Sequence, residues 1–224
     1  IGGKDSMSGT FNEIDVPPTL VSFAVDVAKI QDVITPELKK AGNKLVWLRA
    51  PRDQYDLPDY AGIMDQYEKL HNDIQAGKVV SAYALDRHGI AAAVSKMAFG
   101  NALGVKIEHN LDPRDFFAPG FGDIIMEVPA DKVGQLSITY TLIGEVTDDG
   151  KFSYGNTVIT EKEAEEAWKG TLERVFKTTS GEDNEKQAKD DLYHAENIYV
   201  CKHKVAKPRV FIPVFPGTNC EYDS

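Results

Sequence analysis

The pattern of apolar and polar residues predicts both helices and strands along most of the chain. Apolar side chains at helical spacing predict helices over 59–76, 90–99 and 160–176. Gly77 is a natural stop for the first helix, and Thr160 with Glu163 forms a capping box at the start of the last. The middle helix is rich in alanine, which allows it to pack closely against a sheet.

Strand patterns are more numerous than helical ones. Alternating or continuous apolar runs predict strands over 19–28, 45–48, 78–85, 105–107, 123–128 and 136–146. Asp148-Asp-Gly150 follows the last of these with the composition of a hairpin turn. We therefore expect an α+β fold, in which a mixed sheet has helices packed against it.

Both ends lead us to expect that the chain is a piece of a longer protein. Residues 210–215 form a short apolar run of the kind that a buried parallel strand needs. Pro216-Gly-Thr-Asn219 then supplies a turn that could cap a helix, but the sequence stops before such a helix. At the other end, the sequence starts inside a Gly/Ser-rich loop without an initiator Met.

Composition limits the class of protein. With 224 residues, 42% of them hydrophobic and 27% charged, the chain can hold one globular domain and extra segments. No apolar run approaches the roughly 18 residues of a membrane span, so we expect no membrane partner. A formal net charge of −10 argues against a nucleic-acid partner, because a phosphate backbone needs clustered Lys and Arg. Cys201 and Cys220 are too few for a disulfide scaffold, and with no signal peptide they fit a cytoplasmic protein.

The Gly/Ser-rich start of the chain is the first candidate site. It combines backbone freedom, a cation and two hydroxyls, which is the equipment for holding a phosphate. The residues concerned are Gly2, Gly3, Lys4, Asp5, Ser6 and Ser8. The stretch is not a Walker loop, because Asp5 separates the Gly-Lys pair from the serine. Asp5 is a candidate for orienting Lys4 or for lying near a magnesium ion, and an ordinary surface turn is the alternative.

The second candidate site is Asp86-Arg-His-Gly89, between a predicted strand and the alanine-rich helix. Proteins with α/β elements place ligand contacts at such strand ends and helix starts. His88 is a candidate general base, although a lone loop histidine is more often simply exposed. The other histidines are scattered and show no metal-ligand spacing.

Five segments, in order along nearly the whole chain, together resemble one enzyme family. They are Gly2-Gly-Lys-Asp-Ser-Met-Ser8, Asp15-Val-Pro-Pro-Thr-Leu-Val-Ser-Phe-Ala24, Val33-Ile-Thr-Pro-Glu-Leu-Lys-Lys-Ala-Gly42, Lys96-Met-Ala-Phe-Gly-Asn101 and Phe215-Pro-Gly-Thr-Asn-Cys-Glu221. Their order and spacing resemble the phosphoribosylformylglycinamidine synthase family, in its large form fused to a glutaminase. No single segment carries the resemblance.

The resemblance implies a domain organisation. In the large form, two duplicated synthetase halves each have an ATP-binding subdomain and a carboxy-terminal subdomain, and a class I glutaminase follows. Residues 12–177 then correspond to the second carboxy-terminal subdomain, similar to that of aminoimidazole ribonucleotide synthetase-like enzymes. Residues 1–11 are the tail of the preceding ATP-binding subdomain, 178–208 a charged linker, and 209–224 the first strand and turn of the glutaminase.

The resemblance also implies a reaction. The whole enzyme amidates formylglycinamide ribonucleotide in purine biosynthesis, with ammonia from glutamine and with ATP and Mg²⁺ activating the amide oxygen as a phosphate. The stretch Gly2 to Ser8 then faces the synthetase cleft, as a candidate for nucleotide or substrate-phosphate contact. The implied partners are the other domains of the same polypeptide and small-molecule substrates.

The second candidate site departs from the family pattern. Many members have His-Asp-x-Ser-Asp-Gly-Gly before the alanine-rich helix, where the first Asp binds magnesium and the Ser contacts ATP. Here the stretch is Tyr83-Ala-Leu-Asp-Arg-His-Gly89. If this stretch is aligned with the family pattern without a gap, only Gly89 matches. If two residues of the pattern are deleted in this chain, Asp86 takes the metal-ligand position, but the Ser still has no counterpart. Asp86 is our candidate metal ligand in a half-site that we expect to be structural or vestigial, with Gly89 allowing helix and strand to approach closely.

We expect the chain by itself to be inactive and to contain no catalytic residue. Cys220 follows a predicted strand and a sharp turn, as in a nucleophile elbow, but no Gly-x-Cys-x-Gly pattern surrounds it. The glutaminase resemblance covers only 209–224, and the nucleophile would lie downstream. The main alternative is a stand-alone phosphate-binding or protein-interaction domain. A second is a self-contained ATP enzyme of the aminoimidazole or selenophosphate synthetase type, which would need an upstream acidic magnesium-binding subdomain.

Overall fold

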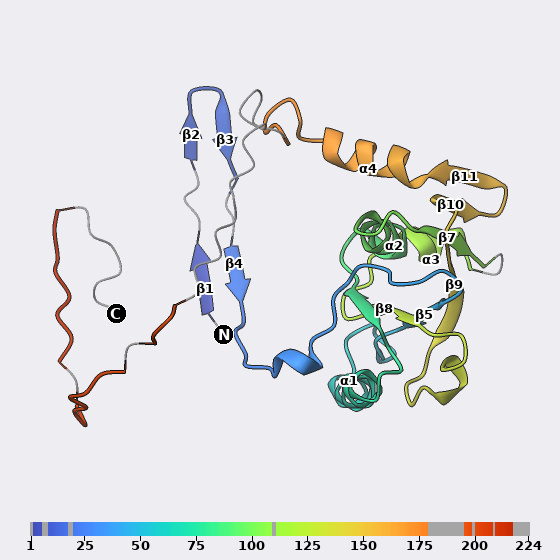
Figure 1. The fold of residues 1–224 in the computed structure, drawn as a ribbon. Coiled ribbons are helices and arrows are strands. Elements are labelled where there is room, and N and C mark those ends of the chain that lie inside the picture. The colour runs from blue at the N-terminus through green and yellow to red at the C-terminus, as the bar shows by residue number, and fades with distance from the viewer. Residues whose placement is uncertain are drawn as a thin grey trace. The chain divides into compact units, whose positions relative to one another are not determined.

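The computed structural model describes residues 2–5, 9–17, 20–108, 111–178, 195–198, 200–207 and 209–216 (Figure 1). By its internal contacts the chain divides into two units, residues 1–178 and 179–224. All helices and strands among the described residues lie in the first unit. None of these helices is long and apolar enough to span a membrane.

A seven-stranded mixed sheet organises the first unit. Its strands are β5 (Lys44–Leu48), β6 (Ser81–Ala84), β7 (Gly104–Ile107), β8 (Ile124–Val128), β9 (Thr141–Thr147), β10 (Lys151–Tyr154) and β11 (Thr157–Thr160). Their order across the sheet is β11-β10-β7-β9-β5-β8-β6. β7 and β10 pair in parallel, and the other neighbouring strands pair antiparallel. The predicted α+β class with a mixed sheet is confirmed.

Three of the four helices in the described residues lie where the pattern predicts helices, and the short helix at 113–117 was not predicted. The helices are α1 (Tyr60–Gln75), α2 (Gly89–Phe99), α3 (Pro113–Phe117) and α4 (Glu161–Gly170), with the 3₁₀ turns η1 (Ile30–Asp32) and η2 (Val133–Gln135). The capping box at the start of α4 is confirmed, because Glu163 N donates to the Thr160 hydroxyl at 3.1 Å and Thr160 N donates to the Glu163 carboxylate at 2.8 Å. α4 ends at Gly170 rather than at residue 176, because a glycine makes a helix costly to continue.

Each face of the sheet has its own apolar core. Successive residues of a strand point to opposite faces, so Leu45 and Trp47 of β5 pack in a cluster with α2, whereas Val46 and Leu48 pack in a cluster with α1. Figure 1 shows α1 and α2 on opposite sides of β5 and β8. The alanine-rich α2 thus packs closely on the sheet, as its composition predicts.

Three predicted strands are clearly shorter in the structure, and one of them, 78–85, forms only over Ser81–Ala84. Of the stretch 19–28, only β4 (Leu20–Phe23) forms, paired antiparallel with β1 (Gly2–Asp5), which offers four residues for pairing. β2 (Gly9–Phe11) and β3 (Ile14–Val16) form a second small ladder. β9 begins at Thr141 rather than at residue 136, because Ser137 is held by α1: its N–H and hydroxyl donate to Asp73 at 2.7 and 2.9 Å.

The predicted hairpin at Asp148-Asp-Gly150 is wrong. β7 lies between β9 and β10 in the sheet, so these two strands are not neighbours. The connection instead crosses the start of β7 at Gly104, where a Cβ would overlap the side chains of Thr147 and Asp149. A residue without a side chain is therefore needed for the crossing, and β10 and β11 form the hairpin instead.

The predicted strand over 210–215 does not form in the described residues. The backbone there is irregular, and Val210 and Phe211 are largely exposed. A parallel strand needs neighbouring strands for its hydrogen bonds, and the described residues of the second unit contain none.

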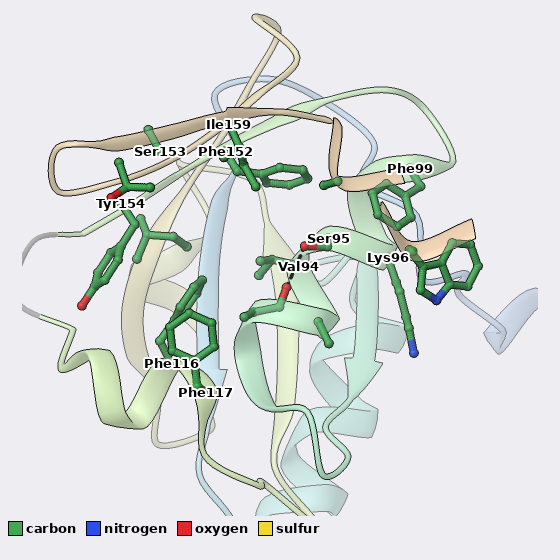
Figure 2. Close-up of a pocket in the computed structure, with 16 residues that line it drawn as sticks. Val94, Ser95, Lys96, Phe99, Phe116, Phe117, Phe152, Ser153, Tyr154 and Ile159 are labelled. Carbon is green, nitrogen blue, oxygen red and sulfur yellow. Dashed lines mark hydrogen bonds between the residues drawn. The ribbon is translucent and has the colours of Figure 1, made fainter. Parts of the chain in front are cut away.

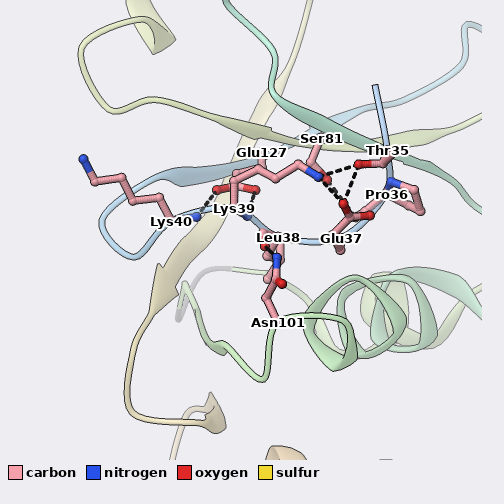
Figure 3. Close-up of polar contacts among 9 residues, drawn as sticks. All are labelled: Thr35, Pro36, Glu37, Leu38, Lys39, Lys40, Ser81, Asn101 and Glu127. Carbon is pink, nitrogen blue, oxygen red and sulfur yellow. Dashed lines mark hydrogen bonds and ion pairs between the residues drawn. The ribbon is translucent and has the colours of Figure 1, made fainter. Parts of the chain in front are cut away.

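Hydrogen bonds at Leu38 join two of the segments that carry the family resemblance, and a buried carboxylate holds one of these segments to the sheet (Figure 3). Glu127 of β8 is fully buried and accepts hydrogen bonds from Lys39 N at 2.7 Å, Lys40 N at 3.0 Å and Asn43 Nδ2 at 2.7 Å. The same loop is bonded to the end of α2, since Leu38 N donates to Met97 O and Asn101 Nδ2 donates to Leu38 O, both at 2.7 Å. The segments 33–42 and 96–101 therefore meet, and what they form is a scaffold contact.

Candidate functional site

The candidate site is a pocket at one end of the central sheet, where β5 and β6 end and β8 begins. We call it the strand-end pocket. It has a volume of about 440 Å³ and is lined by Trp47, Arg49, Arg52, Asp56, Leu85, Asp115, Ala118, Pro119, Gly120, Phe121 and Asp123. Ligand sites in sheet proteins often lie at strand ends, where loops carry polar groups.

A buried carboxylate forms the floor of the strand-end pocket. Asp123 precedes β8 and is only 5% exposed. Its two oxygens accept hydrogen bonds from Trp47 Nε1 and Ala50 N, each at 2.9 Å. Burial raises the pKa of Asp123 above its ordinary value of 3.8, and these two hydrogen bonds oppose the rise in part.

Two arginines stand at the mouth of the strand-end pocket, and both are already bound. The Arg49 guanidinium lies 4.0 Å from the Trp47 ring centre and donates to Asp115 at 3.0 Å. Arg52 donates to the carbonyl oxygens of Asp56 at 3.0 Å and Phe121 at 3.1 Å. The positive charge of the pocket is therefore balanced by the protein's own acceptors.

Asp86, the predicted metal ligand, lies beside this pocket. Its carbonyl accepts from Gly120 N at 3.1 Å, which joins the loop after β6 to the pocket wall. Its carboxylate accepts from His88 N at 2.7 Å, lies 3.1 Å from His88 Nδ1 and is 4.0 Å from Lys96 Nζ. The hydrogen bond from His88 N is the main cause of the lowered pKa of Asp86, and the charges of His88 and Lys96 add to it. Asp86 thus serves as the turn acceptor that positions the start of α2.

Gly89 has a different neighbour from the one expected. It adopts φ +67°, which favours glycine, and a Cβ there would overlap the carbonyl oxygen of Ala118. The close approach is therefore between the start of α2 and the chain after α3, not between helix and strand. Gly89 shapes the wall of the strand-end pocket through packing.

Comparisons with known proteins point in one direction. No protein-family profile matches the chain. The phosphoribosylformylglycinamidine synthase subunit PurL of Corynebacterium aurimucosum is 27% identical over 109 residues, which are 44% of this chain and 14% of that protein.

Solved structures show a related fold in the same kind of enzyme. Phosphoribosylformylglycinamidine synthase II of Thermotoga maritima has a TM-score of 0.51 at 13% identity, covering 61% of this chain and 28% of that one. T. maritima PurL complexed with ATP has a TM-score of 0.50 at 14% identity, covering 61% and 28%. The chain is similar to PurL. It spans less than a third of the length of these relatives.

The residues around Asp86 do not by themselves fit a PurL-like magnesium–nucleotide site. Magnesium is held by carboxylates together with substrate phosphates, in octahedral geometry. In the described part of the chain, no three His, Cys, Asp or Glu side chains gather as metal ligands. One oxygen of Asp86 is occupied by His88, and the serine that contacts ATP in the family pattern has no counterpart in Tyr83–Gly89.

The other predicted site, Gly2 to Ser8, is only partly described. Gly2, Gly3, Lys4 and Asp5 form β1, a paired strand rather than the expected loop, whereas Ser6 and Ser8 lie outside the described residues. Successive N–H groups of a strand point in opposite directions, so these four residues cannot together form a phosphate nest. Phosphate contact by this stretch stays a prediction.

Sequence reasoning missed the residues that line the strand-end pocket. Arg49 and Arg52 directly follow a buried strand, and the rule that ligand contacts lie at strand ends would have singled them out. Asp123 and Asp115 gave no such signal, because each is far in sequence from its partner. The antiparallel pairing of β5 and β8 brings Asp123 to Trp47, whereas Asp115 reaches Arg49 from α3.

Proposed function

We propose that this chain is a piece of a PurL-type phosphoribosylformylglycinamidine synthase, in which the described domain forms one wall of the synthetase cleft. The whole enzyme uses ATP, Mg²⁺ and ammonia from glutamine to amidate formylglycinamide ribonucleotide, so that nitrogen replaces the amide oxygen and phosphate leaves with that oxygen. Two likenesses support the proposal: a partial match in sequence and a shared fold, both with the same kind of enzyme.

In this proposal the domain alone neither binds nucleotide tightly nor catalyses. The observation that carries this part is the internal neutralisation of the strand-end pocket. Arg49 is paired with Asp115, and Arg52 is bonded to backbone carbonyls. A triphosphate entering the pocket would have to displace these acceptors and would lie near the Asp115 and Asp123 carboxylates, which repel it. The missing cations and hydroxyls are then supplied by other domains of the polypeptide.

Isothermal titration calorimetry tests this division of roles. We expect Mg–ATP to bind the chain with a Kd weaker than about 1 mM, that is, by less than roughly 4 kcal/mol. A Kd in the micromolar range would contradict the shared cleft and would favour the stand-alone phosphate-binding domain. The length of the natural reading frame is a second test, and a product that ends near Ser224 would contradict the proposal.

The substitution Asp115→Asn tests the neutralisation argument directly. It frees the Arg49 guanidinium, so we expect inorganic pyrophosphate to bind this variant several-fold more tightly than the parent chain. Asp112→Asn is the matched control, because Asp112 pairs with Arg114 at 3.0 Å and neither residue lines the strand-end pocket. Equal binding by both variants would show that Asp115 does not limit anion entry.

A further inference from the structure

A second, apolar hollow is lined in part by α2 (Figure 2). We call it the aromatic pocket. It has a volume of about 520 Å³ and is lined by α2, α3, α4, β7, β10 and β11, with six aromatic rings: Phe99, Phe116, Phe117, Phe152, Tyr154 and Trp168. Figure 2 shows Phe99, Phe116, Phe117, Phe152 and Tyr154 around one space. The Phe99 ring stacks on Trp168, with ring centres 5.6 Å apart.

Two hydroxyl groups of the aromatic pocket are already in use. Ser95 Oγ donates to Ala91 O at 2.8 Å, and the Tyr154 hydroxyl donates to Leu111 O at 2.5 Å. Small-molecule sites usually combine an apolar lining with a few free polar groups that orient the ligand. Lys96, Ser153 and Thr157 also line the aromatic pocket, but most of its lining is aromatic or aliphatic, so it suits apolar side chains better than a polar metabolite.

Exposed apolar side chains follow this pocket at the end of α4 and in the turns after it. Trp168 stacks on Phe99 at the end of the helix, and Leu172, Val175 and Phe176 lie in the turns beyond Gly170, where Phe176 N donates to Leu172 O at 2.7 Å. Trp168 is 55% exposed and Phe176 78% exposed. We call these four residues the α4 stripe.

Charge does not block contact at the α4 stripe. Four charged residues of α4 pair along the helix, Lys169 with Glu165 at 2.6 Å and Lys162 with Glu166 at 3.9 Å. The four side chains of the stripe are apolar, so their own burial places no charge in the contact.

The exposed apolar area on this face is close to what a stable interface needs. The α4 stripe together with Phe117 and Ile159, which line the aromatic pocket and are also partly exposed, leaves roughly 700 Å² of apolar side chain open to solvent, taking about 150–250 Å² per fully exposed aromatic residue. A standard interface buries about 800 Å² per partner.

We propose that this face binds a second copy of the chain in a two-fold symmetric dimer, with the α4 stripe of each copy seated in the aromatic pocket of the other. An isologous contact needs one self-complementary surface. Here the projecting stripe and the hollow are both apolar, adjoin each other and share Trp168. Two copies related by a two-fold axis bury both features at once. The inference does not depend on the proposed function.

Sedimentation equilibrium over a concentration series tests the dimer. We expect the mass to rise from 24.7 kDa to twice that value and to stop there, with a Kd of about 10 µM or tighter. A chain that stays monomeric over the series, or a mass that grows beyond the dimer, overturns the proposal.

Two pairs of variants locate the interface. Phe176→Glu places a charge on the α4 stripe, and Ala164→Phe fills the aromatic pocket from α4; we expect each to weaken dimerisation at least tenfold. Their matched controls are Ile30→Glu, an equally exposed apolar residue elsewhere (87% exposed), and Ala167→Phe, on α4 but not lining the pocket. We expect both controls to dimerise like the parent, with urea unfolding confirming that every variant is folded. Association that is lost in Ile30→Glu but kept in Phe176→Glu would place the contact on another face and refute the proposal.

Discussion

Replacing Glu127 with glutamine tests how the loop before β5 is held to the sheet. The Glu127 carboxylate is fully buried and accepts three hydrogen bonds, two at Oε1 from Lys40 N and Asn43 Nδ2 and one at Oε2 from Lys39 N. A glutamine of the same size has one acceptor oxygen and one amide nitrogen. If its oxygen keeps the two bonds at Oε1, its NH₂ group faces Lys39 N, which is also a donor.

The expected loss of stability follows from that mismatch. One hydrogen bond to a charged acceptor is lost, and the two that remain lose their charge; since each such bond contributes about 1.5–3 kcal/mol, we expect Glu127→Gln to lower the free energy of unfolding by about 2–4 kcal/mol. Glu127→Ala removes the acceptor of all three donors and leaves a cavity in place of a fully buried side chain, so it should cost more.

Urea unfolding followed by circular dichroism measures the effect, with Glu145→Gln as the control. Glu145 lies on β9 and pairs with Lys44 at 2.6 Å, but its side chain is 34% exposed, so we expect a loss below about 1 kcal/mol. Hydrogen exchange of the Lys39 and Lys40 amides locates the effect, because both should lose protection in Glu127→Gln alone. Equal stability of the two variants, or unchanged protection of these amides, would refute the reasoning.

Three further predictions concern the pocket wall, the buried acid and a helix start. Gly89→Ala should destabilise the fold by about 2–4 kcal/mol in urea unfolding, because alanine is strained at φ +67° and its Cβ meets a carbonyl oxygen, whereas Gly134→Ala, with open space around it, should have little effect. The raised pKa of Asp123 means that the folded state holds its proton more tightly than the unfolded state, so this group stabilises the fold below pH 3.8 and that contribution is lost as pH rises through the folded pKa. Trp47 fluorescence in a Trp168→Phe background should report this titration with a midpoint above 3.8, and a midpoint at or below 3.8 would contradict it. Thr160→Ala should cost about 1 kcal/mol by removing the α4 cap, again in urea unfolding, and no measurable loss would show that the cap is dispensable.

The sequence predicted a feature correctly where that feature depends on residues of one helix alone. The capping box at Thr160 and the stop at Gly77 act within one helical turn, and both helix ends lie where the pattern places them. The hairpin at 148–150 failed because its turn composition says nothing about which strand lies next to β9. That choice depends on Gly104, more than forty residues earlier in the chain, which leaves room for the connection to cross β7.

The candidate site was harder to predict for the same physical reason. Asp123 is recognisable as a site residue only through its burial and its contact with Trp47, which β5–β8 pairing creates. A sequence shows the identity of a carboxylate but not its exposure, and exposure is what raises or lowers its pKa. Asp86 was identified from a family pattern, yet the structure gives it a local task as the acceptor for His88 N.

The segments that carry the family resemblance also explain why fold and activity can separate in this chain. The stretch 33–42 meets 96–101 through hydrogen bonds to Leu38, and Glu127 fixes the loop that follows, so these residues are required by packing. The stretch Tyr83–Gly89 is less constrained by packing, since the fold needs only the turn at Asp86 and the absence of a side chain at Gly89. Polar ligands can therefore be lost from this loop without loss of the fold. A resemblance that rests on such packing residues is evidence for the fold. Ligand binding has to be tested separately at the strand-end pocket, and the most direct test there is Asp115→Asn, which removes the carboxylate that pairs with Arg49.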